Sequence, residues 1–538
     1  MPPVADKQDV VIIGGGHNGL TCACYLAAAG LSVRVLERRG IVGGVAVTEE
    51  FHPGFRNSTA AYTVSLLSPK VIADLDLVRH GLRIIERPIS NFLPLSAEPG
   101  AYLKVGGGLA ATQAEVARYS KRDAERLPAY YAMLEEAAQL LRDLSLETPP
   151  NVGGGLGEIL PALKAMRSVN RLSLPAKRNL LALFAKSAGD LLDAWFESAP
   201  LKAAFAFDAV VGNFASPYAP GSAYVLLHHV FGEVNGKPGQ WGHAVGGMGA
   251  ISEAIAAEAR RRGVAIDCDA EVAQVLIRDG RATGVVLMDG REIAARAVAA
   301  NVNPKLLFVD LIEARHIEPD FLERMRAYRC ASATLRMNVA LSELPRFACL
   351  PETGIHLQSG IIMAPSLAYM ERAWFDAHSG DMAAQPIVEM LIPSTVDGTL
   401  APEGAHVASL FCQHFNPAPA GKSWDELREA AAERVIDTVS RFAPNFRAAV
   451  LGRMTLTPLD LERRFGLTGG DIFHGALSLD QLFSARPVLG NANYRMPLAG
   501  LYLCGSGAHP GGGVTGLPGH NAAREIARDL RRGWRLRS

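Results

Sequence analysis

The chain has 538 residues, of which 49% are hydrophobic and 20% are charged, and its 54 basic residues balance its 54 acidic residues. This composition excludes global disorder, and the length predicts more than one domain. A zero formal net charge argues against nucleic acid as a partner, because gripping a phosphate backbone requires a basic surface.

The seven cysteines are too few for a disulfide scaffold, and no group of them has zinc-finger spacing. We therefore expect reduced thiols, no metal site and a cytoplasmic location. No apolar run is long enough to predict a membrane-spanning helix. The first apolar run, 10–13, abuts a glycine cluster, which favours a buried strand over a signal peptide.

The segment from 9 to 37 has the order that is typical of a dinucleotide-binding fold. An apolar strand leads into a G-x-G-x-x-G spacing, a helix over 20–29 and a second strand over 31–36 that ends in an acid. The glycines permit a tight turn and close approach of a pyrophosphate, the helix N-terminus faces the phosphates, and the acid can bind a ribose. The candidate binding residues are Gly14, Gly15, Gly16, His17, Asn18, Gly19, Glu37 and Arg38.

The basic segment 154–189 carries six basic residues and one acidic residue, with apolar residues at helical spacing among them. Such a segment either lies on an anionic membrane surface or forms a solvated face over an ordinary core stripe. The sequence leaves both interpretations open, so peripheral membrane association stands as an alternative to a purely cytoplasmic location.

Residues 246–301 predict a helix followed by a strand meander. The helix covers 249–262, and strands are expected over 264–267, 271–277, 283–288 and 298–301, with Asp279-Gly280 as a hairpin turn. Farther along, 386–392 and 406–415 read as buried strands.

The carboxyl end of the chain also contains a glycine-rich pattern of the kind that binds nucleotides. A buried strand near 500–505 runs into a glycine-rich stretch and then a helix over 522–530. Such glycine density lets backbone touch a flat ring or a phosphate. The candidate residues here are Gly505, Ser506, Gly513 and Val514.

These motifs resemble those of known flavoproteins. The Gly43-Gly44 pair after the ribose acid resembles the loop that lies against the pyrophosphate of FAD, and the C-terminal glycine stretch resembles that of the carotenoid (phytoene) desaturases and their amine-oxidase relatives. Longer blocks are similar to one phytoene-desaturase-like branch, called pyridine nucleotide-disulfide oxidoreductase domain-containing protein 2. They lie at 216–221, 224–229, 241–248, 465–467, 469–474 and 479–482 with 486–487, and the similarity extends from about 9 to 530.

The resemblance implies an α/β, amine-oxidase-like fold with FAD as cofactor. A Rossmann-type FAD-binding domain would be assembled from 1–70, 243–310 and 492–538, with Val272 near the adenine. A mixed helix and sheet substrate domain would comprise 71–242 and 311–491. In a eukaryotic source the resemblance would imply a mitochondrial location.

The sequence departs from the motifs of related families at two places, and each departure excludes or weakens one expected function. Disulfide reductases have a C-x-x-x-x-C after the paired glycines, whereas 45–48 contains no cysteine, so a dithiol mechanism is rejected. Desaturases usually have Arg after the pair, whereas this chain has Val45, which weakens the transfer of carotenoid specificity.

The resulting functional hypothesis is an FAD-dependent oxidoreductase that removes or adds hydride on a lipophilic or amine-bearing small molecule. The candidate catalytic side chains are His474, Arg486 and His509, and each has a structural alternative as a loop-fixing residue or a buried polar pair. His228-His229, read as part of a strand, would place one imidazole toward a cavity.

Two other functions remain open from the sequence. One is an FAD-retaining interaction or assembly protein without catalytic activity. The other is a nicotinamide-dependent dehydrogenase that uses the N-terminal motif alone, which would leave the paired glycines and the C-terminal stretch without a role.

Overall fold

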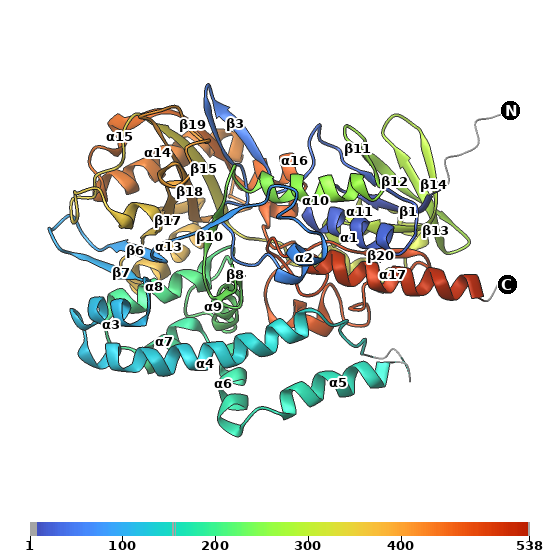
Figure 1. Cartoon of the computed structure of the whole chain (residues 1–538), viewed down its shortest axis with the longest axis horizontal. Coiled ribbons are helices and arrows are strands. Elements are labelled where there is room, and N and C mark those ends of the chain that lie inside the picture. Colours follow the sequence, from blue (N-terminus) through green and yellow to red (C-terminus); the bar gives the residue numbers. More distant parts are fainter. Residues whose placement is uncertain (1–7, 153–154, 156–157, 536–538) are drawn as a thin grey trace.

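A computed structural model describes residues 8–152, 155 and 158–535 of the chain. It has two lobes side by side, each built on a seven-stranded sheet, and both ends of the chain lie at the same lobe (Figure 1). That lobe is called the nucleotide lobe here, and the other is called the substrate lobe.

The sheet of the nucleotide lobe draws its strands from three distant parts of the chain. Its order is β11-β2-β1-β14-β13-β12, and β20 pairs with β14. The pairs among β11, β2, β1, β14 and β20 are parallel, whereas β12, β13 and β14 form an antiparallel meander. The strands are β1 (Gln8–Ile13), β2 (Val33–Leu36), β11 (Ala265–Asp267), β12 (Val272–Arg278), β13 (Arg281–Leu287), β14 (Glu292–Ala300) and β20 (Leu501–Leu503).

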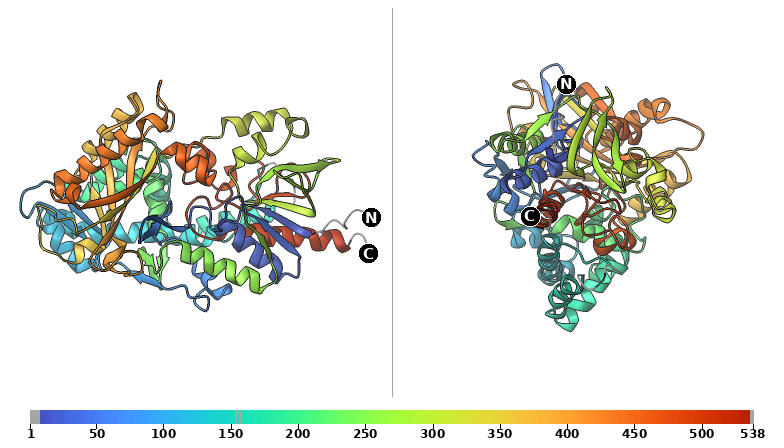
Figure 2. Two further views of the ribbon diagram at one scale, coloured as in Figure 1. Left: turned by 90° about the horizontal axis from the view of Figure 1, so that it is seen from above. Right: turned by 90° about the vertical axis from the view of Figure 1, so that its right-hand side faces the viewer.

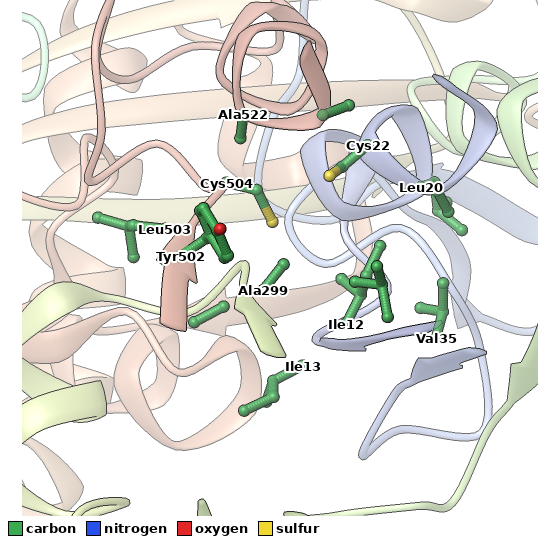
Figure 3. Packing of buried hydrophobic residues seen from close by; sticks show 14 of the residues in the cluster. Ile12, Ile13, Leu20, Cys22, Val35, Ala299, Tyr502, Leu503, Cys504 and Ala522 are labelled. Carbon is green, nitrogen blue, oxygen red and sulfur yellow. The ribbon is translucent and has the colours of Figure 1, made fainter. Parts of the chain in front are cut away.

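Helix α1 (His17–Ala28) packs between α10 (Gly249–Arg261) and α17 (Leu517–Arg535) beside this sheet. Figure 3 shows strand residues Ile12 and Ala299 facing Cys22 of α1 and Ala522 of α17 in one core. The strands read as near-continuous apolar runs because they are buried, which is typical of parallel sheets.

The sheet of the substrate lobe has the order β19-β15-β18-β17-β16-β6-β7. Alternate residues of β18 face opposite sides: Phe411 joins the core beneath the helical region, whereas Leu410 and Cys412 pack toward helix α14. The elements are β6 (Asn91–Pro94), β7 (Tyr102–Val105), β15 (Thr334–Leu341), β16 (Gly360–Met363), β17 (Met382–Leu391), β18 (His406–Phe415), β19 (Val450–Leu456), α13 (Leu367–Ser379) and α14 (Trp424–Phe442).

A helical region completes the substrate lobe, and α5 and α6 extend from its outer edge (Figures 1 and 2). Residues 154, 156 and 157 of the basic segment lie outside the described residues. The helices are α3 (Leu109–Ala117), α4 (Lys121–Ser145), α5 (Ile159–Asn170), α6 (Leu174–Ala185), α7 (Ala188–Trp195), α8 (Ala199–Val210) and α9 (Ser222–Val230). No helix in the described part of the chain is long and apolar enough to span a membrane.

Short elements connect the lobes and cover their edges. They are β3 (Thr48–His52), β4 (Phe55–Ser58), α2 (Pro69–Asp74), β5 (Ile84–Glu86), β8 (Glu233–Val234), β9 (Lys237–Pro238), β10 (Gly242–Ala244), α11 (Pro304–Val309), α12 (Pro319–Ala327), α15 (Phe446–Ala449) and α16 (Pro458–Phe465).

The local predictions mostly hold, with one error. The Asp279-Gly280 turn joins β12 to β13 as expected, and both predicted strands of the substrate lobe form. His228 and His229, however, lie in helix α9 and not in a strand. The apolar run 223–227 fits either element, and Gly221, in a left-handed conformation, starts a helix there.

The buried carboxylate of Glu258 binds basic side chains at the end of helix α10 and outside it. Glu258 accepts hydrogen bonds from Arg261 at 2.6 Å and from Arg262 at 2.5 Å, and it contacts His80 at 2.8 Å. The hydrogen bond from Arg261, followed by those from His80 and Arg262, lowers the pKa of Glu258 to about 2 against the opposing effect of burial.

We predict that Glu258→Gln lowers the stability of the fold by about 2 kcal/mol at pH 7. The pKa of Glu258 is lower in the folded chain than in the unfolded chain, so its contribution is complete above about pH 4.3 and is lost as the pH falls toward 2. Thermal melting of both proteins between pH 7 and pH 3.5 measures this. The exposed Glu253→Gln on the same helix is the control, and a destabilisation that does not change with pH would contradict the assignment.

Candidate functional site

A cavity of about 290 Å³ lies between the two lobes, where β1, β2 and β14 end. Ligands of open α/β sheets bind at the carboxyl ends of parallel strands, so this is the expected place for a nucleotide. The predicted site residues that border it are Gly14, Gly16, His17, Asn18, Glu37, Arg38, Gly44, Val272, His474, Ser506, Gly513 and Val514.

The first glycine loop is shaped by contacts that exclude side chains. A Cβ on Gly19 would lie 2.3 Å from the carbonyl oxygen of Gly14, and one on Gly16 would lie 2.8 Å from Asn301 Nδ2. Gly16 caps helix α1 in an extended conformation, and no side chain caps this helix end. The backbone N–H groups of the first turn therefore suit an anion such as a diphosphate.

Glu37 follows β2 at the edge of the cavity, and its carboxylate is held by backbone. Oε2 accepts a hydrogen bond from the N–H of Gly15 at 2.8 Å, and Oε1 accepts one from the N–H of Arg39 at 2.9 Å. A carboxylate has about four lone-pair sites, so these two bonds orient the group and leave capacity for ribose hydroxyls. Gly15 thus acts through Glu37 and does not itself border the cavity.

The paired glycines lie directly against the first loop. The N–H of Gly43 donates to the carbonyl of Gly15 at 2.8 Å, and a Cβ on Gly44 would come within 3.2 Å of Gly16 Cα. Both glycines have positive φ. Two backbone segments can therefore approach each other beside the N-terminus of α1 without intervening side chains.

The carboxyl end of the chain meets the amino end at this point. Asn18 Nδ2 donates to Ser506 Oγ at 3.1 Å, and His17 Nε2 lies 3.3 Å from the carbonyl oxygen of Gly513. Burial lowers the pKa of His17 to about 4, so its imidazole is neutral at pH 7. One cleft is thus bordered by both glycine-rich segments, although they are far apart in the sequence.

Several polar atoms at the cavity are buried and have no hydrogen-bond partner within the described part of the chain. Asn18 Oδ1, Ser65 Oγ and His474 Nδ1 are of this kind, and all three residues border the cavity. Buried polar groups are almost always paired, so orphan atoms at a cleft indicate a ligand that completes them. With the uncapped helix and the Glu37 carboxylate, they fit the diphosphate, ribose and ring system of FAD.

Of the three candidate catalytic residues, only His474 borders the cavity. Arg486 is fully buried, and its guanidinium donates to backbone carbonyls, among them those of Phe473 at 2.6 Å and Ser506 at 2.8 Å. His509 Nε2 lies 3.0 Å from the carbonyl oxygen of Leu144. Arg486 and His509 therefore bind backbone carbonyls in this structure, as the structural alternative expects, and a catalytic role for either stays a prediction.

Sequence reasoning missed Asn301, whose Nδ2 donates to the carbonyl of Gly14 at 3.1 Å at the cavity edge. A usable signal existed, because Asn301 is the last residue of a predicted strand, and ligands bind at the carboxyl ends of strands in such sheets. Sequence reasoning also missed the lining residues that lie outside the glycine-rich segments, called the aromatic wall here and formed by Tyr62, Thr63, Val211, Trp241, Phe411, Ile472 and Phe473. These residues come from separate loops and from strand β18 and share no local sequence pattern.

Groups that could hold a metal are not found in the part of the chain that the structure describes: no three His, Cys, Asp or Glu side chains gather suitably there. Cys22 and Cys24 are both buried free thiols in helix α1 and do not border the cavity. Burial raises the pKa of Cys24 to about 12, which makes its thiol unreactive.

Comparisons with known proteins agree with this geometry. Residues 19–334 match the family of flavin-containing amine oxidoreductases. Pyridine nucleotide-disulfide oxidoreductase domain-containing protein 2 of Rattus norvegicus is 42% identical over 547 residues, covering 98% of this chain and 94% of that protein. The lycopene-forming phytoene desaturase of Paracoccus sp. is 24% identical, with 95% of each chain covered.

Among solved structures, cyclohexylamine oxidase from Brevibacterium oxydans matches with a TM-score of 0.56 at 16% identity, covering 97% of this chain and 99% of that one. This likeness confirms the amine-oxidase-like fold. The predicted resemblance to desaturase-like and amine-oxidase flavoproteins is also confirmed. The roles of the individual site residues stay predictions.

We predict that Gly16→Val abolishes retention of FAD, because its side chain would meet Asn301 and fill the approach to the helix N-terminus. The visible flavin absorbance per mole of purified protein measures this. Gly398→Val is the matched control, since a Cβ there meets nothing within 4 Å and the backbone φ is ordinary. A yellow Gly16→Val protein would show that the phosphate loop has been misplaced.

Proposed function

The chain belongs to the flavin-containing amine oxidoreductase family and is an FAD-dependent oxidoreductase, and we propose that its substrate is a lipophilic small molecule. FAD supplies the redox chemistry when bound, by accepting hydride from a C–H bond. The chain's own task is to hold the nucleotide, to place a substrate in the cleft and to exclude water from it. A nicotinamide enzyme that uses the N-terminal motif alone is not favoured, since both glycine-rich segments border one cavity.

The observation that carries this proposal is the aromatic wall of the cavity. It is largely apolar and aromatic, with Trp241, Phe411 and Phe473 among its residues. Tyr62 stacks on Phe411 at a ring separation of 5.3 Å, so the aromatic surface is continuous at that point. A surface of this kind binds by burial, at roughly 25 cal/mol for each Å² of apolar area.

The hydroxyl groups of this wall form hydrogen bonds within the protein, and so does His229, which borders the cavity and stacks on Trp241. Tyr62 Oη donates to Glu389 at 2.5 Å, Thr63 Oγ1 accepts from Arg87 at 2.5 Å, and His229 Nδ1 lies 2.8 Å from the carbonyl of Val225. Burial also lowers the pKa of His229 to about 4, so its imidazole is neutral at pH 7. Polar substrate groups would therefore find few partners here, which favours a lipophilic substrate over a charged amine.

Such substrates dissolve in membranes, and we propose that α5 and α6 bring the chain to an anionic membrane surface. Seven of the seventeen large apolar side chains that are exposed in the described structure lie between 152 and 181, including Leu160 at 77% and Leu181 at 69% exposure. Lys164, Arg167 and Arg171 lie on or directly after α5 among them. Apolar side chains that insert and basic ones that meet lipid phosphates are the combination that interfacial helices use.

We predict that phytoene, an uncharged hydrocarbon, reduces the flavin under anaerobic conditions and that cyclohexylamine and putrescine, which are cationic amines at neutral pH, do not. Loss of visible flavin absorbance reports the reaction. Trp241→Ala should keep the flavin bound but slow its reduction about tenfold or more, because a large apolar contact is lost. Trp374→Ala, outside the cavity, is the matched control. Reduction by either amine but not by phytoene, or by none of the three compounds, would count against a lipophilic substrate; the latter would favour a non-catalytic assembly role.

We also predict that the chain sediments with phosphatidylserine-containing vesicles and that Leu160→Asp with Leu181→Asp weakens this binding at least tenfold. The control pair, Met288→Asp with Leu451→Asp, removes apolar side chains of 68% and 51% exposure elsewhere and should leave binding unchanged. Equal losses in both pairs would contradict the surface, and an effect on self-association alone would assign it to contacts between copies.

A further inference from the structure

One loop of the substrate lobe lies directly on the C-terminal glycine segment. This is the loop 471–477, and Phe473 within it occupies the space beside Gly512, where a Cβ would come within 2.6 Å of Phe473 Cα. The next residue, His474, has a φ of +56°. A non-glycine residue in this conformation is uncommon and persists where the surroundings impose it.

Two buried side chains, Asp471 and Arg486, hold the backbone on either side of His474 in the sequence. The Asp471 carboxylate accepts hydrogen bonds from the N–H of Phe473 at 2.8 Å and of Gly475 at 3.0 Å. The Arg486 guanidinium donates to the carbonyls of Phe473 at 2.6 Å and Gln481 at 3.1 Å. Asp471 thus binds the N–H groups of the residues before and after His474, and Arg486 binds the carbonyl of the residue before it. Together they fix the backbone around His474.

Arg486 also ties this loop to the nucleotide lobe. Its Nη2 and Nε donate to the carbonyl of Ser506 at 2.8 and 3.1 Å, and in the described structure it forms no ion pair with a carboxylate. Tyr328 adds a further anchor, since its hydroxyl donates to the carbonyl of His474 at 2.9 Å. Asp471, Arg486 and Tyr328 therefore fix the backbone at and around His474, and the side chain of His474 borders the cavity.

The imidazole of His474 is the part of this assembly that has no assigned partner. Its Nδ1 is buried and unpaired within the described residues, and Asn18 Oδ1 at the same cavity is also unpaired. Ser506, which Arg486 fixes, is the residue to which Asn18 donates. His474 therefore borders the cavity beside the nucleotide segments, directly after Phe473 of the aromatic wall.

We propose that His474 contacts the FAD directly by hydrogen bonding, and that Arg486 and Asp471 are positioning residues that present it. The loop 471–477 then forms a further cofactor-binding segment, contributed by the substrate lobe. Burial, together with the nearby Arg486 and His17, lowers the pKa of His474 to about 3, so the neutral imidazole makes this contact. Binding of the nucleotide thereby couples the two lobes.

The test is the affinity of the apoprotein for FAD, measured by quenching of flavin fluorescence. His474→Leu should weaken binding about tenfold, the loss expected for one hydrogen bond at a buried site, and His474→Gln should recover part of it through its amide. His414→Leu is the matched control, because His414 is also buried with both ring nitrogens unpaired but lies outside the cavity.

A second readout separates positioning from folding. Arg486→Lys keeps a buried cation but cannot span the same carbonyls, so the folded holoprotein should bind FAD more weakly and show an altered visible flavin circular dichroism. Unchanged affinity in both His474→Leu and Arg486→Lys would overturn the proposal. Unchanged FAD affinity with slower flavin reduction in His474→Leu would also overturn it and would make His474 a substrate contact. The affinity measurements need no substrate, so they do not depend on whether the substrate is lipophilic.

Discussion

The rest of the site depends on two close backbone approaches that no side chain larger than hydrogen would permit, one between helices α1 and α17 and one between α1 and the turn that follows β1. A Cβ on Gly519 would lie 2.1 Å from the carbonyl oxygen of Asn18, and one on Gly19 would lie 2.3 Å from that of Gly14. These are steric limits and not attractive contacts. Because both are met, Ser506 comes within hydrogen-bond reach of Asn18, and two distant ends of the chain form one cleft.

The nucleotide side of this cleft could be predicted because its information is local. Each of its parts is a short run in which glycine spacing, an apolar strand and a helix follow one another directly, as at 9–37. The meander behaves in the same way, since Asp279-Gly280 alone predicts the turn between its strands. The boundaries given for the two discontinuous domains stay predictions, although the strands of the first sheet come from all three predicted regions.

The aromatic wall could not be predicted, because it exists only after the substrate lobe has folded. Tyr62, Trp241 and Phe411 are aromatic residues in unrelated local settings, and an aromatic residue alone reads as core. Arg486 shows a second limit of sequence reasoning, because its backbone contacts could not be read from its local sequence. Its charge and its place in a similar block suggested chemistry, whereas the folded chain uses it to satisfy backbone carbonyls. Only the long-range contacts distinguish these roles.

The two sides of the cavity differ in how their polar atoms are used, and this difference bears on selectivity. On the nucleotide side Asn18 and His474 each retain an unpaired buried atom, whereas on the aromatic wall Tyr62 and Thr63 are bound to protein. A ligand held by unpaired polar atoms is discriminated strongly, because a wrong ligand leaves them unsatisfied. A ligand held by apolar contact is discriminated by only about 1–3 kcal/mol per methylene. If the substrate is lipophilic, the chain should thus be selective for its cofactor and tolerant toward its substrates, and a membrane surface that concentrates particular lipids would supply selectivity that the wall does not.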